Sequence, residues 1–202
     1  MAGLYAFAVE GLSTLSSLDD LPAKIEQAAR RAVNAATDRA RAAAVRGVRQ
    51  QVNFPASYFT GDDSRLRVSK RPSTGDLEGV VTGRQRPTSL ARFTTSGSVG
   101  TRGGVTVEVK SGSARFMRRA FLIRLRAGNA DLDTKSNLGL AVRLKPGESL
   151  SNKRNMIRMS NGLYLLYGPS VDQVFRTVAS DISPEIADFL EAEFLRLVGL
   201  DL

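Results

Sequence analysis

Residues 19–54 read DDLPAKIEQAARRAVNAATDRARAAAVRGVRQQVNF, and this stretch decides the fold. Asp19 and Asp20 precede Leu21-Pro22, in the manner of a helix N-cap followed by a proline in the first turn. No further proline and no run of β-branched residues interrupts the pattern that follows. The stretch therefore predicts one long N-terminal helix over residues 20–54.

This predicted helix has two apolar stripes. At 100° per residue the first stripe is mostly alanine and glycine, which predicts a closely approaching partner. It consists of Leu21, Ile25, Ala29, Ala32, Ala36, Ala40, Ala43, Gly47 and Phe54. A second stripe begins on the opposite side with Val45, Val48 and Val52. Two apolar faces are hard to bury inside a small monomer, so we expect the helix to contact two bodies.

Beyond the turn-rich residues 53–64 the chain has the character of β-structure. Short runs alternate apolar and polar residues, as half-buried strands do, and glycine, serine and threonine fill the connections. The run 116–125 is expected to be a strand, although it is long enough to compete as a helix. Polar loops are expected at 127–136 and 145–155, which completes a β-rich body over residues 64–167. The expected strands lie at 65–69, 79–82, 90–94, 105–110, 116–125 and 138–144.

The chain closes on helical patterns over residues 170–198. Gly168-Pro169-Ser170 is a turn into an N-cap, and Gln173 three residues later completes a capping box. Ser183-Pro184-Glu185 repeats this pattern and predicts a second, final helix. The whole chain, 1–202, is expected to be a single α+β domain. It would combine the long N-terminal helix, a small antiparallel β-sheet or incomplete barrel, and amphipathic C-terminal helices.

The composition excludes most common enzyme chemistry. The 202 residues contain no histidine and no cysteine. Nucleophilic systems that depend on histidine, thiolate nucleophiles, zinc and iron–sulfur sites built on cysteine, and disulfides are therefore impossible. We expect no catalytic, cofactor-binding or metal-binding residues, and a protein that acts through its surfaces rather than as an enzyme. Apolar runs are only a few residues long and Met1–Leu18 has no basic residue, so we expect a soluble chain without a secretory signal.

Charge is distributed unevenly along the chain, whose net charge is +9. Residues 1–20 hold three acids and no base, and residues 21–126 hold 21 lysines or arginines against seven acids. Residues 169–202 hold seven acids against Arg176 and Arg196 alone. A basic body with an acidic tail can bind an acidic partner, or another copy of itself head to tail.

Four features resemble binding or catalytic sites, and each favours a structural interpretation. The glycines of 97–104 lack the lysine and following helix of a phosphate loop and suit a hairpin connector. Asp62-Asp63, and Asp131 with Asp133, have too few ligands for a calcium loop. The carboxylates on the last helix suit its solvated face; they are Asp188, Glu191 and Glu193.

Two arginine-rich clusters leave a second function open. The first is Arg65, Arg67, Lys70 and Arg71, and the second is Arg115, Arg118, Arg119, Arg124 and Arg126. Such clusters can bind phosphates. The chain has no tryptophan, 6% aromatic residues and no RNA-recognition motif, so acidic protein partners are the more economical explanation. A basic nucleic-acid-binding module remains the alternative.

Several segments in this order resemble the minor tail protein Z family of tailed bacteriophages, the tail-completion or neck proteins. The likeness covers most of the chain and rests on packing and turn features. These are the Ala/Arg-rich helix, AFLI (120–123), LAVRLKPG (140–147), LYLLYGPSVDQVF (163–175) and FLEAEFLRL (189–197).

The resemblance implies a structural virion protein. Members of the family sit where tail meets head, assemble as rings on the end of the tail, and help to make a joining-competent, DNA-conducting particle. The expected partners are other copies of the chain, in a closed homo-oligomeric ring of six subunits. The head-completion or connector proteins and the tail-terminator or tail-tube proteins are expected to lie next to this ring. Phage DNA would lie nearby without specific contact. The expected location is the virion neck, and the host cytoplasm during assembly, with no membrane and no cofactor.

Overall fold

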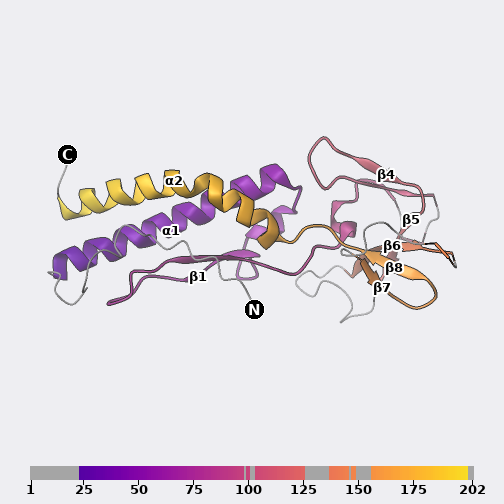
Figure 1. The fold of residues 1–202 in the computed structure, drawn as a ribbon, viewed down its shortest axis with the longest axis horizontal. Helices are drawn as coiled ribbons and strands as arrows, with labels where there is room; N and C mark the ends of the chain where they lie inside the picture. The colour runs from indigo at the N-terminus through magenta and orange to yellow at the C-terminus, as the bar shows by residue number, and fades with distance from the viewer. Residues whose placement is uncertain are drawn as a thin grey trace.

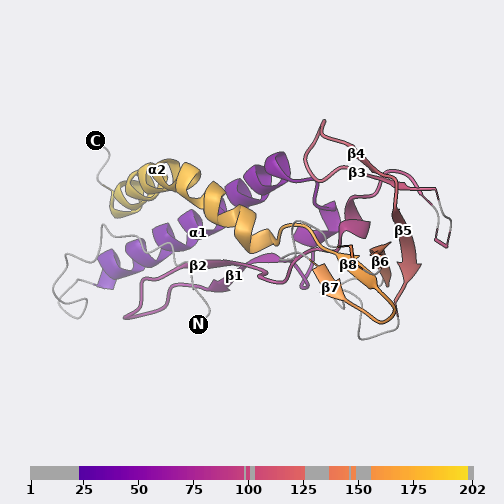
Figure 2. The same cartoon turned by 45° about the vertical axis from the view of Figure 1, so that its right-hand side comes forward.

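The computed structural model of the chain describes residues 23–97, 99–100, 103–125, 137–145, 147–148 and 156–199 (Figure 1). Two long helices, α1 (Ala23–Gln51) and α2 (Val171–Val198), run antiparallel at one end of an elongated molecule, and strands β3 to β8 occupy the other end (Figures 1 and 2). Within the described part of the chain, no helix has an apolar stretch long enough to cross a membrane.

The two stripes of α1 are both buried, and both partners belong to the same chain. Its alanine stripe, with Ala36 and Ala40, packs on Ile186 and Leu190 of α2. Gly47 permits the same close approach further along, since a Cβ there would lie 2.5 Å from a methyl group of Val178. The prediction of a long helix with a close partner is confirmed.

The valine stripe of α1 packs in the main core. Val48 and Val52 lie there with Leu66, Val81 and Phe175. The inference that two apolar faces exceed what a monomer can bury is therefore wrong: α2 covers one face, and a β-hairpin together with the first turns of α2 covers the other. These stripes do not by themselves require a second subunit.

That hairpin consists of β1 (Leu66–Lys70) and β2 (Val80–Gly83), which follow the 3-10 helix η2 (Ala56–Phe59). The strands pair antiparallel, with Leu66 opposite Gly83 and Val68 opposite Val81. Gly79 leads into β2 against α1, where any side chain would overlap the Thr37 hydroxyl. The hairpin therefore lies directly on α1.

The remaining strands form two further antiparallel sheets. β3 (Val105–Val107) pairs with β4 (Arg115–Met117). The other sheet has the order β5-β6-β8-β7. Its strands are β5 (Ala120–Arg124), β6 (Leu138–Arg143), β8 (Leu163–Leu166) and β7 (Met156–Arg158).

Both faces of the four-stranded sheet are apolar. One face, with Leu122, Leu140 and Leu166, lies in the main core. The other carries a separate cluster around Ala141 and Leu165. The described chain is thus an α+β fold with small, open antiparallel sheets, which confirms the predicted class.

Two of the predicted strands are wrong in detail. Residues 90–94 form a 3-10 helix, η3 (Leu90–Phe93), because Ser89 caps it by accepting a hydrogen bond from the Ala91 N–H. Five alternating residues are too few to distinguish these conformations. Residues 116–125 are not one strand, since a turn at Arg118-Arg119 separates β4 from β5. The predicted loop at 127–136 lies outside the described residues.

The predicted break in the C-terminal helices is also wrong, because α2 is continuous through Pro184. Proline removes the hydrogen bond to the carbonyl four residues earlier, here that of Ser180. Ser180 and Pro184 are both exposed, so water can satisfy this carbonyl. Apolar residues on both sides of the proline, such as Val178 and Ile186, are buried and hold the helix together.

Filling the close contact between the helices should destabilise the protein. Ala36 is 2% exposed beneath α2, so Ala36→Leu is expected to lower the free energy of unfolding by about 1–3 kcal/mol through overpacking. Urea denaturation followed by circular dichroism measures this change. Ala42→Leu is the matched control, since Ala42 is exposed on the same helix. Equal stability of the two variants would contradict the close packing.

The start of α2 is fixed by a capping box, as predicted. The Ser170 hydroxyl accepts from the Gln173 N–H at 3.1 Å, and the Ser170 N–H donates to the Gln173 side chain at 3.0 Å. Just before it, the Gly168 N–H donates to the Thr88 carbonyl at 2.7 Å. The turn is therefore tied to the segment that leads into η3.

Removing this cap should cost measurable stability. Ser170 is buried, and Ser170→Ala leaves the Gln173 N–H without its hydrogen-bond acceptor. We therefore expect the free energy of unfolding to fall by about 0.5–2 kcal/mol. Thermal and urea denaturation measure the loss. Ser180→Ala makes the same change at an exposed position of α2 and should leave stability unchanged or slightly raised. A Ser170→Ala variant as stable as this control would show that the cap is dispensable.

Candidate functional site

The most distinctive surface feature is that the acidic second half of α2 and the most basic strands lie at different ends of the molecule. The second half of α2 and the start of α1 lie at one end, and the four-stranded sheet with β4 lies at the other (Figures 1 and 2). α2 holds six carboxylates against two arginines. The described residues of 115–125, 137–145, 147–148 and 156–166 hold seven lysines or arginines against one carboxylate. The molecule therefore has one end with an acidic helix and one strongly basic end.

The basic end combines strands that are far apart in sequence. Its cations are all exposed and come from β4 to β7 and their connections; they are Arg115, Arg118, Arg119, Arg124, Arg143, Lys145 and Arg158. Four of them were singled out from the sequence, and the structure adds Arg143, Lys145 and Arg158. Strand pairing brings these three residues close to the predicted cluster, and a count of charges along the sequence cannot reveal this. Arg126, the fifth predicted member, lies outside the described residues.

One arginine of this end has an internal role. Arg119 makes two hydrogen bonds to Glu148, at 2.7 and 3.2 Å, and a third to the Arg143 carbonyl. The Arg119 guanidinium, helped by the Lys145 N–H, lowers the pKa of Glu148 to about 2. Glu148 therefore stays ionised and paired until the pH falls to about 2, while the stability that the pair contributes is lost progressively as the pH falls from about 4.5 to about 2. We expect Arg119 to be less available to a partner than its neighbours.

Four of the six carboxylates of α2 are exposed, whereas Asp172 is buried beside Arg176 and Glu193 is partly buried. Asp181, Asp188 and Glu191 are exposed, whereas Glu185 pairs with Arg39 of α1 at 2.9 Å. Glu193 pairs with Arg196 at 2.7 Å, and this hydrogen bond lowers the pKa of Glu193. A carboxyl group with a lowered pKa stays ionised at neutral pH and is poorly suited to donate a proton. The arrangement favours electrostatic contact over acid–base chemistry.

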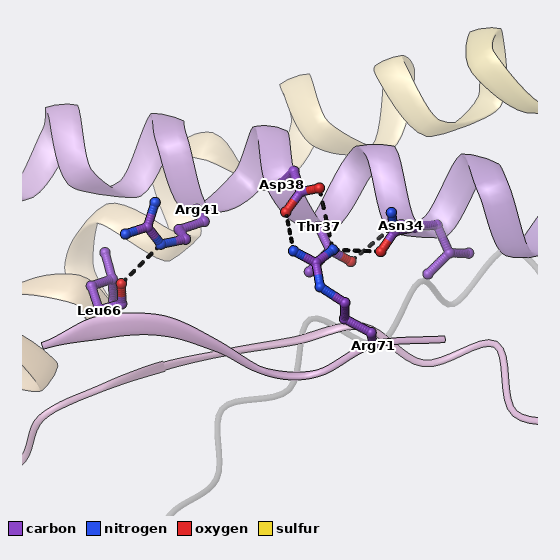
Figure 3. A network of polar contacts seen from close by, with 7 residues as sticks. Asn34, Thr37, Asp38, Arg41, Leu66 and Arg71 are labelled. Carbon is purple, nitrogen blue, oxygen red and sulfur yellow. Dashed lines mark hydrogen bonds and ion pairs between the residues drawn. The ribbon is translucent and has the colours of Figure 1, made fainter. Parts of the chain in front are cut away.

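The first arginine cluster is divided among structural roles. Arg71 donates to Asp38 at 2.8 and 3.2 Å and to Asn34 at 2.5 Å, which ties the end of β1 to α1 (Figure 3). Lys70 pairs with Asp76 at 2.8 Å and with Glu78. Arg65 is 4% exposed and lies over the ring of Tyr58. We therefore do not treat this cluster as a single binding surface.

Arg41 is a structural residue that the sequence did not reveal. It is half-buried and donates to the Leu66 carbonyl at 3.1 Å (Figure 3). It also donates to the Phe59 carbonyl at 2.9 Å. A third hydrogen bond reaches the Ser64 hydroxyl at 3.2 Å. Arg41 thereby fixes the start of β1 on α1. Its partners are 18 to 25 residues away along the chain, so no local pattern indicated them.

The loops that were weighed as sites keep their structural interpretation where they are described. Residues 94–95 pair with β3, so the glycines of 97–104 belong to a connector that returns the chain onto that strand. Asp62 and Asp63 are exposed beside a pocket of about 270 Å³ that Arg65, Arg67 and Arg84 also line. The described residues contain no group of three or more acidic side chains placed to hold a metal ion. Asp131 and Asp133 lie outside them.

No family model, curated protein or solved structure matches this chain.

Proposed function

We propose that this chain is a ring-forming structural protein of a tailed bacteriophage, a tail-completion or neck component at the head–tail junction. The observation that carries the proposal is the separation of the acidic helix and the basic sheet along the molecule. The sequence resemblance supports the same function, and the absence of histidine and cysteine fits a role without turnover.

The acidic second half of α2 and the basic strands at the other end favour heterologous contacts between copies. In such a contact the basic end of one subunit binds the acidic helix of the next, and a ring results if the rotation between subunits closes. Six subunits is the number we propose. A ring of this kind leaves two outer faces for the head-completion or connector proteins and for the tail-terminator or tail-tube proteins. It belongs to the virion neck, and to the host cytoplasm during assembly.

A basic nucleic-acid-binding module is the second candidate. The seven exposed cations of the basic end favour it, because clustered lysines and arginines displace counterions from a phosphate backbone. A ring in a DNA-conducting neck and a DNA-binding monomer use the same cations differently. In the ring, these cations mainly bind the carboxylates of α2 of another copy. In the DNA-binding monomer, they bind phosphates.

Mass measurement and electron microscopy decide between these functions. We expect multimers at low salt by light scattering, with closed rings in class averages, and weaker assembly at high salt as the charges are screened. The double change Arg118→Glu with Arg124→Glu should raise the dissociation constant about tenfold, if each reversed pair changes the contact by under 1 kcal/mol. Arg46→Glu with Arg67→Glu is the matched control, since both arginines are exposed and belong to neither of the two charged surfaces.

The outcomes are distinct. Adding Asp188→Arg and Glu191→Arg to the double change should restore assembly, since the attraction is then reversed rather than lost. A strictly monomeric mass at high protein concentration and low salt would contradict the ring. Salt-sensitive binding of DNA by that monomer would support the second candidate.

A further inference from the structure

The β3–β4 hairpin forms an apolar groove at the surface. The groove has a volume of about 640 Å³, and its apolar lining is Leu90, Val107, Val109, Phe116 and Met117. Phe116 is 62% exposed, which is the greatest exposure of any large apolar side chain in the described part of the chain. An exposed aromatic ring beside an apolar groove is typical of an interaction site.

The hairpin also offers backbone hydrogen-bonding groups. β4 pairs with β3 through Val105–Met117, Thr106–Phe116 and Val107–Arg115. Within the described residues, no strand pairs with the other side of β4. Such an edge can accept an added strand, whose alternate side chains then enter the adjoining groove.

The N-terminal segment of the chain has the composition to occupy this site. Residues 4–9 read LYAFAV and place Tyr5, Phe7 and Val9 on one side of an extended strand. No proline lies before Pro22 to prevent strand pairing. Eleven of the first 20 residues are apolar, so this segment needs an apolar surface against which to lie.

Charge complements this apolar match. Residues 1–20 contain three acids and no base, whereas the rim of the groove carries the exposed Lys110 and Arg115. Glu10 directly follows the alternating stretch, where it can reach a cation of the rim. The two other exposed large apolar side chains of the described residues, Ile157 at 53% on β7 and Val99 at 43%, do not line this groove.

Length indicates which copy provides the segment. The Asn53 N–H donates to the Val109 carbonyl at 2.8 Å, so the groove adjoins the C-terminal end of α1. The segment enters α1 at its other end, and 29 helical residues span about 43 Å. The 13 residues between Val9 and Ala23 reach at most about 43–47 Å when fully extended. Reaching the chain's own groove would therefore require a completely straight connection.

From these observations we infer that residues 4–9 of one copy bind along β4 and insert Tyr5, Phe7 and Val9 into the groove of a neighbouring copy. This rests on the proposed ring, because it names a contact that joins consecutive subunits. The segment and the groove lie at opposite ends of α1, so each copy gives its segment to one neighbour and receives one from the other. The binding itself does not require the ring to close.

Mixing two defective variants tests the exchange. Phe7→Asp disables the segment and leaves the groove intact, whereas Phe116→Asp disables the groove and leaves the segment intact. Phe116 is exposed, so its substitution should preserve the fold. Each variant alone should remain monomeric at concentrations at which the natural chain assembles, and an equal mixture should form dimers of twice the mass. Ile157→Asp is the matched control and should assemble normally.

Disulfide trapping provides a second measurement that does not depend on loss of assembly. The natural chain has no cysteine, so only introduced pairs can form a bond. Val9→Cys combined with Ser113→Cys or with Arg115→Cys should give a ladder of linked chains after oxidation. Linked products confined to single chains, or no linked product with either pair, would overturn the inference.

The two proposals fail in different ways. If Phe7→Asp and Phe116→Asp both still form rings and the mixture shows no new species, the exchanged segment is wrong and the ring stands. If the mixture dimerises and the natural chain forms only open chains under the microscope, the exchange stands and the proposed ring is wrong.

Discussion

Ending the chain before Pro184 is expected to unfold the helical end of the molecule. The second half of α2 contributes Ile186 and Leu190, both buried against Ala36 of α1, and partly buried neighbours including Phe189. Each fully buried aliphatic side chain contributes about 1.5–3 kcal/mol, so several such contributions disappear together. The first half of α1 would then expose its alanine stripe and lose its partner.

Circular dichroism and hydrogen exchange measure this effect. We expect helix content to fall by more than the 15 deleted residues of α2, and amide protection to vanish over the first half of α1. A chain that ends at Gly199 keeps the whole of α2 and its C-cap, and is the matched control. If α1 stays protected in the truncated protein, α2 does not stabilise it.

The same deletion bears on the proposed function. Complementation of a phage that lacks the gene should yield heads and tails that fail to join, while tail tubes still form. The chain ending at Gly199 should restore joining. Normal yields of joined, infectious particles with the truncated chain would show that this half of α2 is dispensable.

Phe175→Ala is expected to have the largest effect of any single substitution considered. Phe175 is 1% exposed in the main core, where α1, the β1–β2 hairpin and α2 meet. Truncating a buried phenylalanine lowers the free energy of unfolding by about 3–5 kcal/mol, through lost burial and the cavity that remains. Domains of ordinary stability have only about 5–15 kcal/mol, so the variant should be close to unfolding at body temperature.

Phe116→Ala is the control for this substitution. It removes the same ring from an exposed position, and we expect a change within about 0.5 kcal/mol. Urea denaturation at low protein concentration compares the two without a contribution from assembly. Similar losses of unfolding free energy in both variants would show that Phe175 does not lie in the core.

Local patterns made much of the helical structure predictable. The α1 helix follows from an uninterrupted apolar periodicity, and the Ser170–Gln173 capping box depends on residues three apart. The stop predicted at Pro184 was wrong for a tertiary reason, since packing on both sides of the proline outweighs the lost hydrogen bond. The residues of η3 show the same limit at short range, because five alternating residues suit a strand and a 3-10 turn equally well.

The candidate site was predictable only in part. Counting charges identified the acidic tail and most of the cations of the basic end. The distance between the acidic helix and these cations, however, depends on the packing of α2 against α1. Arg143 and Arg158 join the basic end through strand pairing. Arg71 was assigned to a basic cluster, yet it binds Asp38, 33 residues earlier in the chain. A single sequence does not show which distant residues form such side-chain pairs.

The packing of α1 against α2 has a consequence for synthesis on the ribosome. Ala36 and Leu190 touch the same cluster and are about 150 residues apart in the chain. At about 5–20 residues per second, α1 emerges roughly 8–30 s before the end of α2 is made. The β1–β2 hairpin follows α1 closely and can cover its valine stripe early. In the described chain the alanine stripe has Leu77 of the hairpin as an early partner, but its other apolar partners all lie on α2 and are made last. Folding of the helical end is therefore completed only when the last codons of the message are translated.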